Sequence, residues 1–131
     1  MKIATEYYSL EYNVEKNRIY FNCMGDWTSR TVAPDFIKDW ESITEHVKSD
    51  WTLLGDLRGV GEFARDAQDW HTEAQQFVMS RGVRKVAQVA PFDTAGTVRA
   101  FSKKSGMEKI LWAFSEPELA ESWLDDEIEV G

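Results

Sequence analysis

The sequence predicts an α/β domain in which four helices cover a mixed, mostly parallel five-stranded sheet, with the element order ββαβαβαβα. Three observations lead to this class. The chain begins with two segments that alternate between apolar and polar residues, and from residue 51 short apolar runs alternate with segments of helical periodicity. Its 131 residues fit one domain, residues 1–131, and contain no linker or internal repeat.

The first three elements follow from their hydrophobic periods. Apolar and polar side chains alternate over residues 8–12, residues 13–17 form a hairpin loop, and residues 18–24 form the second strand, which ends at Gly25. Pro34 opens a helix, because its missing N–H costs nothing in the first turn. The apolar stripe of this helix consists of Phe36, Ile37, Trp40, Ile43 and Val47.

The next strand–helix unit begins with the apolar run of residues 51–57, which is typical of an interior strand. Asp66 is placed to cap a helix that runs to about Arg81, and Gly82 is a natural stop for it. Its inward face consists of Trp70, Ala74, Phe77 and Val78.

Two more units complete the chain. Residues 83–90 form a strand, a helix begins at Asp93 or Thr94 and ends at Gly106, and residues 109–114 form the last strand. The final helix has the spacing of a capping box, with Ser115 as the cap and Glu118 reaching back to it. Its apolar face consists of Leu119, Ala120, Trp123 and Leu124.

The formal net charge of −8 is unevenly distributed. Residues 116–131 carry seven acids and no base, whereas residues 81–109 carry seven bases and two acids. We expect the acidic segment to be a solvated helix face with a frayed end; the alternative is that it engages the basic stretch, in the same chain or in a neighbour. The acidic balance argues against nucleic acid as a partner, because phosphate binding depends on clustered Lys and Arg.

Cys23 is the only cysteine and alternates inward on its strand, so we expect it to be a small buried hydrophobe in a reducing compartment. The start of the chain lacks the apolar run of a secretory signal. No run approaches the roughly 20 apolar residues that span a bilayer. We therefore expect a cytoplasmic protein that is not transmembrane.

Residues 53–66, Leu-Leu-Gly-Asp-Leu-Arg-Gly-Val-Gly-Glu-Phe-Ala-Arg-Asp, resemble a strand–loop–helix segment of the STAS domain, the SpoIIAA-like fold of anti-sigma-factor antagonists. The element order resembles this family over nearly the whole chain. Asp66 matches the family's loop aspartate, but Ala67 and Gln68 stand where the family has its phosphorylatable serine. The Trp-rich sequence is closer to the STAS/SEC14-type branch, which is compared in fold with lipid-binding CRAL-TRIO domains. The resemblance implies no catalytic residue and no phosphoswitch.

Ligands of open parallel sheets bind beyond the carboxyl ends of the strands. Residues 26–27, 58–66, 91–93 and 115 are expected at such ends, and we predict that this edge is the functional face. The predicted partner or ligand contacts are Trp27 as an aromatic anchor, Arg58 and Arg65 as guanidinium contacts, and Glu62, Phe63 and Asp66 in a mobile loop.

Other candidate sites are weaker. Residues 59–64 match the G-x-G-x-x-A form of the dinucleotide fingerprint, but Glu62 and Asp66 would repel a phosphate, so we expect a flexible glycine loop and no cofactor. His46 and His71 have no metal-ligand spacing, and we expect His71 to be exposed or to contact a partner. Packing in the core is expected for Trp40, Trp70 and Trp123.

The sequence thus predicts a non-enzymatic STAS-like binding or regulatory domain that acts on a protein partner or a small apolar ligand. The alternative is a carrier of a lipid or another apolar ligand, which requires a continuous apolar cavity between helices and sheet. A small enzyme is a third possibility, which convergent polar side chains with strongly shifted pKa values in a closed pocket would support. A homodimer through an exposed sheet edge is a further possibility.

Overall fold

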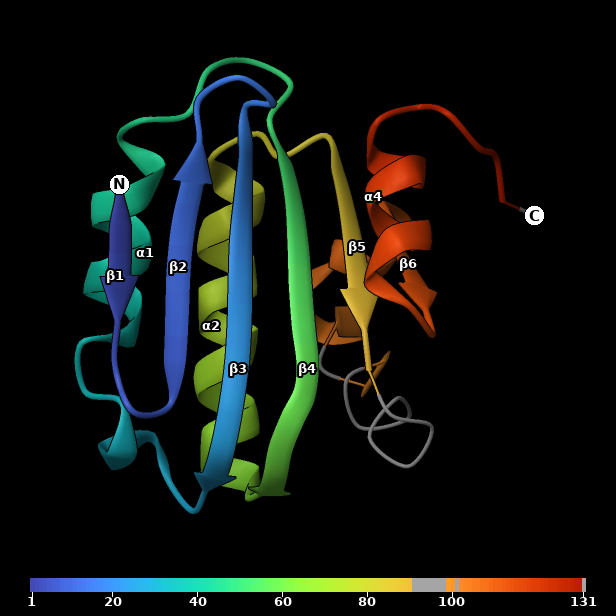
Figure 1. Cartoon of the computed structure of the whole chain (residues 1–131). Coiled ribbons are helices and arrows are strands. Elements are labelled where there is room, and N and C mark those ends of the chain that lie inside the picture. The colour runs from blue at the N-terminus through green and yellow to red at the C-terminus, as the bar shows by residue number, and fades with distance from the viewer. Residues whose placement is uncertain (91–98, 101, 131) are drawn as a thin grey trace.

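In the computed structural model, which describes residues 1–90, 99–100 and 102–130, six strands form one mixed sheet in the order β1-β2-β3-β4-β5-β6. Figure 1 shows the sheet face-on. The strands are β1 (Lys2–Ala4), β2 (Tyr8–Asn13), β3 (Arg18–Trp27), β4 (Thr52–Phe63), β5 (Lys85–Val89) and β6 (Leu111–Phe114). The helices with described bounds are α1 (Phe36–Thr44), α2 (Arg65–Ser80) and α4 (Pro117–Leu124), with short 3-10 turns at Arg30–Val32 and Met107–Lys109.

The α/β class and the mixed, mostly parallel sheet are confirmed. Strands β1, β2 and β3 pair antiparallel, and β3, β4, β5 and β6 pair parallel. The predicted number of five strands is wrong, because β1 adds a sixth at the edge next to β2. A three-residue strand is too short for an alternating pattern to be recognised in the sequence.

The helices lie on both faces of the sheet. Helices α1 and α2 cover one face, and α4 lies against the other face over β4, β5 and β6 (Figure 1). Right-handed crossovers between strands that are neighbours in sequence place their helices on the same face. Helix α4 follows the last strand and is free of that constraint. The larger core therefore lies between the sheet and α1 and α2.

Strand β4 is longer than predicted. The expected glycine loop at residues 58–63 belongs to this strand, and β3 likewise continues through Gly25 to its end at Trp27. The two strands pair along this extension with two register irregularities. At position 61 a Cβ would lie 2.2 Å from the Asp26 Oδ1 that accepts the Glu62 N–H at 2.7 Å, so a larger residue would displace this exposed carboxylate and its hydrogen bond. The glycines therefore permit close strand pairing here and do not form a mobile loop.

Three predicted helix starts are wrong by one or two residues. Helix α1 begins at Phe36, after Pro34, and the N-cap of α2 is Ala64, with Asp66 inside its first turn. The N-cap of α4 is Glu116, with Pro117 at the first helical position, so Ser115 does not cap it. In α4 the rigid proline determines the start, because its fixed φ suits the first helical position.

The remaining boundaries are close to the prediction. Strands β5 and β6 occupy the centre and the end of their predicted ranges. Residues 99–100 and 102–105 are helical, and Gly106, with φ of 81°, follows them as predicted. The predicted start of this helix at Asp93 or Thr94, and the strand end at 91–93, lie outside the described residues.

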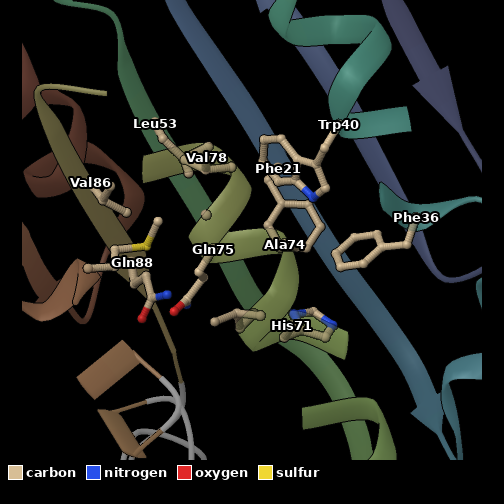
Figure 2. A pocket seen from close by; sticks show the side chains of 13 residues that line it. Phe21, Phe36, Trp40, Leu53, His71, Ala74, Gln75, Val78, Val86 and Gln88 are labelled. Atoms are coloured by element: carbon tan, nitrogen blue, oxygen red, sulfur yellow. The ribbon is translucent and has the colours of Figure 1, made fainter. Parts of the chain in front are cut away.

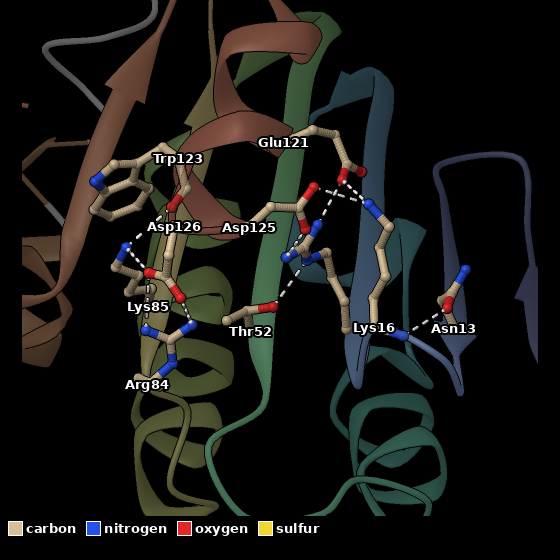
Figure 3. Close-up of polar contacts among 10 residues, drawn as sticks. Asn13, Lys16, Thr52, Arg84, Lys85, Glu121, Trp123, Asp125 and Asp126 are labelled. Carbon is tan, nitrogen blue, oxygen red and sulfur yellow. Dashed lines mark hydrogen bonds and ion pairs between the residues drawn. The ribbon is translucent and has the colours of Figure 1, made fainter. Parts of the chain in front are cut away.

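The acidic segment engages bases of the same chain (Figure 3). Arg18 is almost fully buried beneath α4, where its guanidinium pairs with Glu121 at 2.5 Å and with Asp125 at 2.9 Å. Lys16 pairs with the same two carboxylates. Arg18 and Lys16 lie outside the basic stretch, so these pairs attach α4 to the sheet but are not the predicted contact. The alternative interpretation of the acidic segment is confirmed in part only by the pairs that Asp126 forms with Arg84 and Lys85.

Part of the basic stretch takes part in the same attachment. Asp126, just beyond α4, pairs with Arg84 at 3.2 Å and with Lys85 at 2.8 Å. The Lys85 ammonium also lies 4.5 Å from the ring centroid of Trp123, a cation–π contact. Within the described part of the chain, no helix is long and apolar enough to cross a membrane.

Candidate functional site

The core between the sheet and helices α1 and α2 contains a small cavity of about 30 Å³ (Figure 2). That is room for about one or two water molecules. Most of its lining is apolar because strands β3, β4 and β5 present their inward positions to it. The lining residues are Phe21, Phe36, Trp40, Leu53, Gly55, Leu57, His71, Ala74, Gln75, Val78, Val86, Gln88 and Met107.

His71 lies in an aromatic box at one end of this cavity. Its ring centroid is 4.5 Å from that of Trp27 and 4.8 Å from those of Phe36 and Phe63. Burial lowers the pKa of His71 to about 3, so the imidazole is neutral at pH 7. The prediction of an exposed or partner-contacting histidine is therefore wrong. Helix α2 places position 71 against the end of β3, which sequence spacing alone does not reveal.

Two polar groups in the cavity wall have no hydrogen-bond partner among the described residues. One is the Nε1–H of Trp40, which is fully buried. The other is the side-chain amide of Gln88 on β5; this residue is 7% exposed and borders the outer cleft, so water can reach part of its amide. A buried polar group without a partner costs about 1–3 kcal/mol, so such groups are rare and are often functional.

Gln75 on α2 contrasts with Gln88, because its amide is satisfied on both sides. Its Nε2 donates to the Ser102 Oγ at 3.1 Å, and its Oε1 accepts from the Ser105 Oγ at 2.7 Å. Figure 2 shows the side chains of Gln75 and Gln88 extending toward the same end of the cavity from helix and strand. We call Gln75, Gln88 and Ser102 the polar wall.

A larger cleft of about 340 Å³ lies on the other side of the polar wall, toward the carboxyl end of β5. Its volume is at the low end of the range for small-molecule sites, about 300–1,000 Å³. Gln88 lines both the cavity and the cleft. The other residues of the cleft are Ala90, Arg99, Ser102, Glu108, Leu111, Trp112 and Ala113.

The cleft carries one cation and one anion that are not engaged elsewhere. Arg99 and Glu108 are both exposed and line the cleft. Neither forms an ion pair or a side-chain hydrogen bond within the described part of the chain, in contrast to Arg18 or Asp126. Leu111 and Ala113 add an apolar surface, since their register with Val86 and Gln88 turns them toward the same face of the sheet.

The six residues predicted as contacts do not form one surface. Trp27 is fully buried and its Nε1 donates to the Met24 carbonyl at 3.1 Å, so it is not an exposed anchor. Phe63 is half-buried against Trp27 and His71. Arg58 lies within β4, on the face that carries α4, and its guanidinium pairs with Asp56 at 2.7 Å.

The other three predicted residues are exposed at the carboxyl end of β4 and the start of α2. They are Glu62, Arg65 and Asp66. Asp66 is not available to a partner, because it accepts hydrogen bonds from the backbone N–H of Arg30 at 2.8 Å and from its guanidinium at 3.0 Å. These two bonds lower the pKa of Asp66. The guanidinium of Arg30 also lies 4.9 Å from the ring centroid of Trp70.

The predicted core packing of the tryptophans is confirmed in full for Trp40 and Trp123 and in part for Trp70, which packs against the core. Trp40 and Trp123 are buried, whereas Trp70 is half-buried and donates its indole N–H to the Ala33 carbonyl at 2.8 Å. Cys23 is buried, as predicted, and burial raises the pKa of its thiol, so it is unreactive. Over residues 1–90, 99–100 and 102–130, no group of three or more His, Cys, Asp or Glu side chains could hold a metal ion.

The polar wall was not recognised in the sequence, although one signal points to it. Gln88 falls at an inward position of a buried strand, two residues after Val86, where an apolar side chain is expected. Comparison with protein-family models, with curated proteins and with solved structures found no match. Membership of the STAS family therefore remains a prediction, and the candidate site stands on its geometry.

Proposed function

We propose that the protein is a non-enzymatic binding domain that takes a small ligand in the cleft at the carboxyl end of β5. The observation that carries this proposal is the amide of Gln88, which is nine-tenths buried, has no partner among the described residues and lines the cleft. A ligand with a donor and an acceptor on one edge would satisfy that amide. The location agrees with the general preference of ligands for the carboxyl edge of parallel strands.

The composition of the cavity favours binding over catalysis. His71 is the titratable side chain that lines it, and a base with a pKa of about 3 is too weak for proton transfer near neutral pH. The described lining residues include no carboxylate, hydroxyl or thiol that could act with it. Burial among aromatic rings thus explains the lowered pKa of His71 without a catalytic role.

The size of the cavity argues against the lipid carrier that the sequence left as an alternative. A carrier needs an apolar tunnel between helices and sheet, and the cavity there holds about 30 Å³. That volume has room for about one or two water molecules. The proposed ligand is therefore small and binds in the outer cleft, against the polar wall.

Benzamide is a suitable first probe, because it carries an amide edge complementary to Gln88 on a compact apolar ring. Titration to about 10 mM, followed by ¹H–¹⁵N and methyl NMR, should shift the side-chain amide of Gln88 and the methyls of Leu111. Gln88→Met should abolish the Leu111 shifts. Gln76→Met, at an exposed glutamine on α2, is the matched control and should leave them unchanged.

Two results would contradict the proposal. Either an absence of shifts at Gln88 and Leu111 over the whole titration or unchanged Leu111 shifts in Gln88→Met would show that the cleft does not bind through this amide.

A further inference from the structure

The charges of the outer cleft define the class of its ligand more closely. This step rests on the proposed function and concerns the same site. Arg99 offers a guanidinium that is not paired with any described carboxylate, and Glu108 offers a carboxylate that is not paired with any described base. Some other exposed charges are joined in pairs, as Arg30 is with Asp66 and Glu73.

An unpaired cation and an unpaired anion in one small cleft favour a ligand that carries both charges. A purely anionic ligand would gain from Arg99 but would be repelled by Glu108, and a purely cationic ligand would meet the reverse. A zwitterion gains from both groups at once. Its carboxylate suits the planar guanidinium, which donates two parallel hydrogen bonds, and its ammonium suits the carboxylate of Glu108.

The rest of the cleft is suited to a short apolar side chain. Its apolar lining consists of Ala90, Leu111, Trp112 and Ala113, and the volume of about 340 Å³ limits the ligand to a small molecule. Gln88 lies at the inner end, where its amide can donate to a carboxylate oxygen or accept from an ammonium. We propose that the cleft binds a free α-amino acid with an apolar side chain, through Arg99, Glu108 and the amide of Gln88.

The inference is tested with L-leucine and two analogues that each lack one charge, 4-methylpentanoate and 3-methylbutylamine. Calorimetry and the NMR signals of Gln88 and Leu111 measure binding. Leucine should bind about tenfold more tightly than either analogue, which is the effect of one charge-assisted hydrogen-bonded pair. Leucylglycine, a zwitterion with more widely spaced charges, should bind more weakly than leucine.

Two variants assign the charges. Arg99→Gln should weaken leucine binding about tenfold and leave the amine unaffected, and Glu108→Gln should weaken leucine binding about tenfold and leave the acid unaffected. The matched controls are Lys103→Gln and Glu116→Gln, exposed charges that do not line the cleft, and they should not change the affinity for leucine.

The failure of this inference can be told apart from the failure of the proposed function. If either analogue binds as tightly as leucine, or if both charge variants leave leucine binding unchanged, the amino-acid assignment is overturned and the cleft remains a binding site. Tighter binding of leucylglycine would overturn the free amino acid in favour of a dipeptide. If benzamide shifts the signals of Gln88 and the leucine series does not, the assignment alone fails. If benzamide also fails, the proposed function falls with it.

Discussion

Gln88→Met should stabilise the protein while it removes ligand binding. The variant keeps the unbranched side chain and its length, so packing against Gly55 and Val86 is nearly preserved. It removes a buried amide that has no partner among the described residues, and such a group costs about 1–3 kcal/mol. Because the outer side of Gln88 borders the cleft, water relieves part of that cost. We expect a gain of about 1 kcal/mol, at the low end of the range.

The measurement is urea unfolding followed by tryptophan fluorescence, in which the midpoint should rise at an unchanged m value. The expected shift in Tm is about 4 °C for a domain of this size. Gln75→Met is the matched comparison, since its amide lies in the same wall but is hydrogen-bonded to Ser102 and Ser105. It should lose about 1–3 kcal/mol, because Ser102 is 1% exposed and would be left without its donor.

A clear result would refute this reasoning. If Gln88→Met lowers the free energy of unfolding by 1 kcal/mol or more, as Gln75→Met is expected to do, the amide of Gln88 contributes to folding. The amide would then have a structural role, and the argument that it is available to bind a ligand would fail.

Three further perturbations test other parts of the structure. Lowering the pH from 7 to 5 should reduce the free energy of unfolding by about 2 kcal/mol through His71. The imidazole of the unfolded chain, with a pKa near 6.5, gains a proton over this range, whereas the buried imidazole, with a pKa of about 3, does not. Urea titrations at both pH values should show that His71→Leu removes this dependence. Glu121→Gln combined with Asp125→Asn should cost about 3–5 kcal/mol by calorimetry, because it leaves the buried Arg18 unpaired. Gly61→Ala should cost about 0.5–1.5 kcal/mol in urea unfolding, because its Cβ would displace the Asp26 carboxylate from the Glu62 N–H.

Each of these perturbations has a control and a contrary outcome. Equal pH dependence in the wild type and the histidine variant would show that the imidazole is protonated in the folded state. Asp126→Asn removes an exposed partner and should cost about 0–1 kcal/mol; an equal loss in the α4 double variant would show that Arg18 does not depend on its acids. Gly55→Ala should be milder than Gly61→Ala, since its nearest contact would be at 3.6 Å.

The sequence by itself determined the class of the fold and the order of its elements from β2 onward, except for the two short 3-10 turns and for the start of the helix that precedes Gly106, which lies outside the described residues. Period-two alternation in the hairpin, and helical spacing in stripes such as that of Phe36 and Trp40, survive in the structure because each element must bury one face. The inward position of Cys23 follows from the same alternation. These are local properties, since periodicity within one segment decides which side chains share a face.

Only the tertiary structure decided which residues of other elements pack against those faces. In the sequence Gly59 and Gly61 predict a loop, yet both lie in β4, where Gly59 and Val60 pair with β3. His71 reads as a surface residue on a polar helix, yet the crossing of α2 over the end of β3 surrounds it with rings. The polar wall likewise joins residues that are 13 or more positions apart in sequence, and no local pattern links Gln75 with Gln88. Burial and hydrogen bonding depend on how several elements pack together, whereas a periodic pattern describes one element at a time.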